Sequence, residues 1–271
     1  MQARRRCLIA VSAAVIAFFL CVPVFPQQAQ ASTKEQLILQ IQQLMTERNL
    51  AGARQLLGEA AKRYPAEDAG FDNLLGIIEA QEGNTAAAES SFQRAIKSAP
   101  KFTGAYLNLG RLYQETSPID PQAAPKALAV YRQVLQYDPD HGEANYQSAM
   151  LLMRQGAYRD SLDHLQRLPA NVQQSAQALS VGCADYAGLG DSERANEAAS
   201  RLLAHPDFSE LDVRTIQSAL ATPGEHSALL IKLFEGLQKR QQLSPGMMRS
   251  LALAYERAGV LDKRATRWKN Q

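Results

Sequence analysis

A sequence unit with a period in the mid-thirties repeats along this chain, and that period constrains the fold more than composition does. Between Ala69 and Pro139 the sequence passes twice through an apolar helical stripe, a break, a second stripe and a closing proline. Gly76 and Gly110 hold the same place in the first stripe of each copy and lie 34 residues apart. A self-similar period of this length is typical of arrays of helix pairs.

The second stripe of each copy repeats as closely as the first. Its apolar positions fall at i, i+4 and i+7, which is one face of a helix. They are Ala88, Phe92 and Ala95 before Pro100, and Ala127, Tyr131 and Val134 before Pro139. Proline ends a helix because it lacks an N–H and clashes with the preceding turn. The pattern therefore predicts two helices per unit, and no alternating strand pattern competes with it.

This pattern resembles the tetratricopeptide repeat (TPR), a family of antiparallel helix pairs that stack into a right-handed superhelix. The resemblance implies an all-α solenoid. It also implies close helix approach at small residues, which Gly76 with Ala88 and Gly110 with Ala127 would supply. A large residue of the second helix then fills the joint to the next unit, the role expected of Phe92 and Tyr131.

Extending the period in both directions divides the chain into a leader, residues 1–31, and one solenoid, residues 32–271. The solenoid is expected to hold six or seven helix pairs. The predicted units are 34–67, 69–102, 103–141, 142–169, 176–206, a degenerate unit at 209–244, and a C-terminal cap at 245–271. The degenerate unit is inferred from the 69 residues that separate Gly190 from Gly259, about two periods. Terminal units of solenoids are usually atypical because one face meets water.

The first 31 residues have the pattern of a secretory signal peptide. Three arginines, Arg4 to Arg6, precede an apolar run from Cys7 to Val22, and Ala29-Gln30-Ala31 supplies a small-residue exit. We therefore expect cleavage after Ala31 and a periplasmic or secreted protein. The run of 16 residues is shorter than the ~20 that a spanning helix needs. An uncleaved membrane anchor remains the alternative, and N-terminal sequencing of the mature protein would decide.

Charge and cysteine content follow from this processing. The chain has 29 Lys and Arg against 27 Asp and Glu, and the leader holds three of the arginines and no acid. The mature chain is therefore close to neutral and lacks the clustered positive charge expected of a nucleic-acid binder.

Two of the three cysteines leave with the leader. Cys183, then alone, is interpreted as a small buried residue between two helices, with a reactive thiol as the lesser alternative.

Catalytic and metal-binding patterns are missing from the sequence. The four histidines fall in separate units without a second His or Cys at metal-ligand spacing, and His141 is expected in a solvated turn. No nucleophile elbow or phosphate-binding glycine loop is found. A proline-containing insertion at 117–121 is expected to form a loop, which either contacts a ligand or is decoration. The sequence predicts neither enzyme activity nor a cofactor.

The expected binding surface is the concave groove lined by the first helix of each unit. Tyr, Met and Arg, residue types common at interfaces, occur along it. The predicted groove residues are Asn73, Ile77, Asn108, Arg111, Tyr146, Gln147, Met150 and Arg154, with Gln81, Leu107, Glu115 and Met153 beside them. We interpret the protein as a non-catalytic adaptor for a protein or extended peptide in the cell envelope. The alternative is a helical domain of, or accessory to, an envelope enzyme with an unrecognised site.

Overall fold

The computed structural model describes residues 33–64, 68–117, 120–220 and 225–260, and every regular element in these ranges is a helix. The predicted all-α fold is therefore confirmed. In chain order the helices are α1 (Lys34–Thr46), α2 (Leu50–Arg63), α3 (Ala69–Gln81), α4 (Thr85–Ser98), α5 (Thr103–Thr116), α6 (Ala123–Tyr137), α7 (Gly142–Arg154), α8 (Tyr158–Gln166), α9 (Ala170–Gln173), α10 (Ala176–Gly188), α11 (Ser192–Ala204), α12 (Glu210–Ala219), α13 (Ser227–Gln238) and α14 (Pro245–Arg257).

Local sequence signals set the ends of these helices. Asp68 caps α3 through hydrogen bonds from the Gly70 and Phe71 amides, and Ser244 caps α14 with Pro245 as its first residue. Side-chain oxygens at this position satisfy amides that have no partner within the helix. Most of the described turns that need a left-handed backbone use glycine, such as Gly156 at φ 76°, whereas Arg48 takes this conformation at φ 59° in the turn after α1. These turn glycines carry part of the repeat period.

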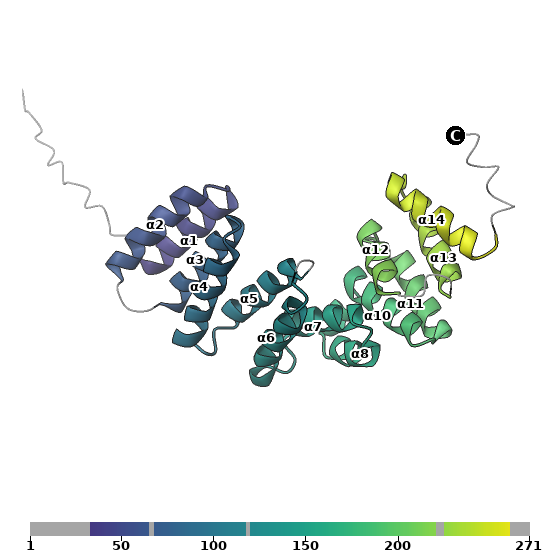
Figure 1. The fold of residues 1–271 in the computed structure, drawn as a ribbon, viewed down its shortest axis with the longest axis horizontal. Helices are drawn as coiled ribbons and strands as arrows, with labels where there is room; N and C mark the ends of the chain where they lie inside the picture. The colour runs from purple at the N-terminus through teal and green to yellow at the C-terminus, as the bar shows by residue number, and fades with distance from the viewer. Residues whose placement is uncertain (1–32, 65–67, 118–119, 221–224, 261–271) are drawn as a thin grey trace, which may run out of the picture.

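The two helices of each of the first five pairs, α1/α2, α3/α4, α5/α6, α7/α8 and α10/α11, pack against each other. The second helix of each of the first three pairs also packs against the helix that follows it. In Figure 1 the chain follows a curved path, with α6 and α8 on the outer side of the bend and α5 and α12 toward its open side. Apolar residues between successive helices form the core, because each pair can bury its apolar faces only against its neighbours.

Two aromatic rings explain the glycines in the first helices. A Cβ atom built on Gly76 would lie 2.6 Å from the Phe92 ring, and one on Gly110 would lie 2.5 Å from the Tyr131 ring. Both rings are only 1% exposed. Ala88 and Ala127 are fully buried, and the pairing of the two glycines with these alanines stays a prediction. Each glycine makes room for the aromatic ring of its own unit, although Phe92 also belongs to the core it shares with α5.

The C-terminal half departs from simple stacking. Here α12 packs on α10 and α13 on α11, while α7 reaches past its neighbour to contact α12. The Tyr158 hydroxyl, at the start of α8, donates a hydrogen bond to the Ala219 carbonyl oxygen at 2.9 Å, and its ring covers Gly188. Units that are not adjacent in the sequence therefore contact each other at this point.

Several sequence-based expectations lie outside the described residues. They are the leader 1–31, residues 118–119 of the insertion, Pro65, the turn 222–224, and Trp268 with the polar tail 264–271. Across the described ranges, no helix has the length and apolar character needed to span a bilayer.

Candidate functional site

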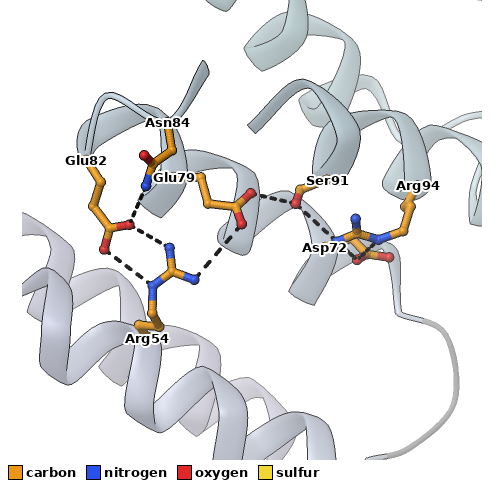
Figure 2. Close-up of polar contacts among 7 residues, drawn as sticks. All are labelled: Arg54, Asp72, Glu79, Glu82, Asn84, Ser91 and Arg94. Atoms are coloured by element: carbon orange, nitrogen blue, oxygen red, sulfur yellow. Dashed lines mark hydrogen bonds and ion pairs between the residues drawn. The ribbon is translucent and has the colours of Figure 1, made fainter. Parts of the chain in front are cut away.

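A chain of polar contacts anchors α3, the first helix that carries predicted groove residues. From α2, Arg54 donates to both carboxylate oxygens of Glu82, with its Nη2 atom 2.6 Å from Oε2 (Figure 2). Its Nη1 atom also lies 4.0 Å from Glu79 Oε1. The hydrogen bond from Arg54 lowers the pKa of Glu82 below its usual value. This arginine therefore joins the first helix pair to the C-terminal end of α3.

The same chain continues from α3 to α4. The buried Ser91 hydroxyl donates to Glu79 Oε2 at 2.7 Å, and Arg94 donates to Ser91 and to Asp72 Oδ1 (Figure 2). Glu79 is 9% exposed, so its carboxylate depends on Ser91 and Arg54 for stabilisation. Both ends of α3 are thus fixed by charged contacts that involve none of the predicted groove residues.

A hydrogen-bonded pair of asparagines, both predicted groove residues, links α3 to α5. The Asn108 Nδ2 atom donates to Asn73 Oδ1 at 2.9 Å. Asn73 is 9% exposed, whereas Asn108 is half-buried. The predicted residue Asn73 therefore serves to orient Asn108 and offers little surface of its own. The two are 35 residues apart, close to one repeat period.

A second polar link connects α5 to α7. Gln114 Nε2 donates to Gln147 Oε1 at 3.0 Å, and Gln147 Nε2 donates to Glu143 Oε1 at 2.8 Å. Glu143 also lies 3.9 Å from the exposed Arg111, a pair that contributes little in water. Gln114 and Glu143 are absent from the predicted set. The spacing of 33 residues between Gln114 and Gln147 follows the repeat and is a usable signal for this link.

A pocket of about 190 Å³ lies where α3 and α5 face each other. Three predicted residues line it, Ile77, Asn108 and Arg111. Phe92 and Leu112 add apolar surface. The rest of the lining consists of Ala80, Gln81 and Glu115. The pocket thus combines apolar walls with amide groups, one guanidinium and one carboxylate.

The predicted residues of α7 do not all join this pocket. Tyr146 and Met150 pack against the C-terminal core, and burial together with Asp212 and Glu143 raises the pKa of Tyr146 to about 12. Met153 is fully buried, so its expected place in the groove is wrong. Arg154 is exposed at the end of the helix. Helix α12 contacts α7, and its Asp212 lies close enough to Tyr146 to act on the pKa of that hydroxyl.

The histidines take structural positions. His141 Nδ1 accepts a hydrogen bond from the Ala144 amide and caps α7, so it is more than the solvated turn residue expected. His164 Nδ1 lies 2.8 Å from Asn145 Oδ1, and burial lowers the pKa of this histidine. The Asn145 amide group donates to two backbone carbonyls, so its oxygen must accept from His164. Within the described ranges no group of three His, Cys, Asp or Glu residues could hold a metal ion.

Cys183 lies where the sequence places it. The residue is fully buried between α10 and α11, with its Sγ atom 3.5 Å from the Ala195 carbonyl oxygen. Burial raises the pKa of this thiol to about 12. The thiolate, which is the reactive form, is therefore strongly disfavoured in the folded protein.

Two family profiles described as tetratricopeptide repeat match residues 39–113 and 119–181. The chain belongs to the tetratricopeptide repeat family, as the sequence resemblance predicts. These matches run from α1 into α5 and from the insertion into α10, so they include every residue that lines the α3–α5 pocket except Glu115. No curated protein sequence matches the chain significantly.

Solved structures agree on the fold. A tetratricopeptide repeat protein from Parabacteroides merdae superimposes with a TM-score of 0.65 at 18% identity, covering 88% of this chain and 91% of that one. YrrB, described as a TPR protein with an unusual peptide-binding site, gives 0.52 at 16% identity, covering 68% and 92%. A TPR protein from Thermus thermophilus gives 0.50 at 17% identity, covering 69% and 98%. At these identities the likeness extends to the fold alone.

Proposed function

We propose that this protein is a non-catalytic scaffold that binds an extended peptide segment of a partner along α3, α5 and α7. Membership of the tetratricopeptide repeat family supports the broader class, a protein-interaction scaffold. The narrower assignment to a peptide depends on the pocket between α3 and α5. We also propose that the protein is located in the cell envelope, which depends on the leader at residues 1–31.

The observation that carries the proposal is the orientation of Asn108 at the pocket. One Nδ2 hydrogen is held by Asn73, which leaves a second hydrogen and the Oδ1 atom. A peptide backbone presents a donor and an acceptor in the same way, so one asparagine side chain can satisfy both. Because Asn73 already fixes the side chain, binding costs less conformational entropy.

The apolar part of the pocket supplies a place for one side chain of such a peptide. Ile77 and Phe92 line it, and Phe92 is held rigidly against Gly76. Arg111 at the rim is exposed and only loosely paired with Glu143, so it can approach an acidic group or a backbone carbonyl of the peptide. Apolar anchoring with a few oriented polar groups is the usual composition of a ligand site.

The proposal can be tested with peptides selected on the wild-type protein from a random phage-displayed library. Arg111→Glu should weaken binding of the selected peptides at least tenfold, because an acidic group or carbonyl oxygen of the peptide that approaches Arg111 would then face a carboxylate. Fluorescence anisotropy measures the affinity. Arg257→Glu on α14 is the matched control, because Arg257 is exposed and lies outside the pocket. Equal affinity of the two variants would refute the assignment of this pocket.

Capture of an enzyme rather than a peptide-bearing partner from envelope extract would favour the accessory-domain alternative.

A further inference from the structure

A carboxyl group is buried at the meeting point of three helices in the middle of the solenoid. Asp185 of α10 is fully buried, and its Oδ2 atom lies 2.7 Å from the Ser161 hydroxyl of α8. The same hydroxyl lies 2.9 Å from the Ala149 carbonyl oxygen of α7. Ser161 is fully buried as well. One short hydrogen-bonded chain therefore connects α7, α8 and α10.

The protons in this chain can be counted. A serine hydroxyl donates one hydrogen bond, and a backbone carbonyl can only accept. Two acceptors, Ala149 O and an ionised Asp185, would therefore compete for a single hydrogen. Both contacts are satisfied when Asp185 carries a proton, donates to Ser161, and Ser161 donates to Ala149. The arrangement of the three oxygens favours the neutral carboxylic acid.

The second oxygen of the carboxyl group points to the same conclusion. Asp185 Oδ1 has no hydrogen-bond partner among the described residues. A buried carboxylate with one unpartnered oxygen is costly, whereas the carbonyl oxygen of a neutral acid tolerates this far better. Burial, only partly opposed by the hydrogen bond that Ser161 can give to the ionised form, raises the pKa of Asp185 to about 7.

No charged neighbour compensates a negative charge at this position. The helices packed against α10 are α7, α8, α9, α11 and α12. In the described part of the chain, their titratable side chains that are buried or partly buried are Glu143, Tyr146, Tyr158, His164, Glu210 and Asp212. All of these except Tyr146 have hydrogen-bond partners other than Asp185, and burial beside acidic groups keeps Tyr146 neutral. On α10 itself, Cys183 is kept neutral by burial, and the Tyr186 ring lies against Arg194.

We propose that Asp185 forms a pH-sensitive joint, in which a protonated carboxyl group holds α7, α8 and α10 together and loss of the proton weakens their packing. The joint lies between the α3–α5–α7 surface and the C-terminal helices, and α7 contacts both α10 and α12. Its state therefore affects how the C-terminal helices pack against the last helix of the proposed groove. This inference does not depend on the proposed peptide ligand.

The sign of the effect follows from proton linkage. The pKa of Asp185 is raised in the folded state, so the contribution to stability is complete below the unfolded value of about 3.9 and is lost as pH rises through 7. Between pH 5 and pH 8 the folding equilibrium constant should fall roughly a hundredfold through this one group.

Urea unfolding of the full chain between pH 5 and pH 8 tests the joint. Asp185→Asn keeps the size of the side chain, and its amide can still donate to Ser161. The ratio of its folding equilibrium constant to that of the wild type should rise roughly a hundredfold from pH 5 to pH 8. Asp160→Asn, an exposed aspartate on α8, is the matched control and should leave the ratio constant. A constant ratio for Asp185→Asn as well would overturn the proposal.

A measurement on the wild-type protein covers the case in which Asp185→Asn fails to fold. The ¹³C chemical shift of the Asp185 carboxyl carbon, followed by NMR against pH, reports its protonation directly. A midpoint above pH 6, with hydrogen exchange in α8 and α10 becoming faster across the same range after correction for intrinsic rates, supports the joint. A midpoint near pH 4, or exchange protection that does not change, contradicts it.

Discussion

Replacing Gly76 with alanine tests whether aromatic rings of the same unit dictate the repeat glycines. The added Cβ atom would lie 2.6 Å from the Phe92 ring, which is nearly fully buried and held on its other side by the core shared with α5. Overpacking of this kind costs about 1–3 kcal/mol. Alanine gains about 1 kcal/mol over glycine in a helix interior. The overpacking cost is thus partly offset, and the variant should be destabilised by up to about 2 kcal/mol.

The assay is urea unfolding followed by far-UV circular dichroism, with two comparisons. Gly182→Ala on α10 is the matched control, because this buried helical glycine has room for a Cβ atom, 3.6 Å from Leu165. It should be stabilised by up to about 1 kcal/mol. In a Phe92→Ala background, Gly76→Ala should lose its cost, since the ring has gone. Destabilisation that persists in that background, or equal effects at Gly76 and Gly182, would refute the reasoning.

Two further predictions concern buried polar groups. Ser91→Ala should destabilise the protein by about 1–3 kcal/mol because it leaves a Glu79 oxygen unpartnered, whereas the exposed neighbour Ser90→Ala should have little effect in the same urea assay. Cys183 should not react with a thiol reagent at pH 8 in the folded protein and should react fully in urea, because burial raises its pKa to about 12. Rapid labelling of the folded chain would show that the thiol is accessible.

The local pattern of the sequence is sufficient to predict the helical fold and the place of Cys183. Both depend on spacing within a unit, which a helix of 3.6 residues per turn converts directly into a face. The aromatic–glycine contacts are also encoded locally, although the sequence alone does not tell which partner fills the space over Gly76. These features repeat because each unit meets the same neighbours.

The candidate site is less predictable because it depends on contacts between distant units. Met153 and Tyr146 are predicted to face the groove, yet Met153 is fully buried in the C-terminal core and Tyr146 packs against that core, where α12 contacts α7. The hydrogen bond from Tyr158 to Ala219 spans 61 residues and leaves no periodic signal. Asp185 is detectable in the sequence only as an acid within an otherwise small and apolar stretch, and its partner Ser161 only from the structure.

The proposed binding of a peptide in the α3–α5 pocket can be tested by ¹⁵N chemical-shift mapping of the protein with a library-selected peptide. We expect the largest shifts at Ile77, Asn108 and Arg111, with smaller ones along α7. Shifts confined to the outer helices α6 and α8, or to α14, would contradict it.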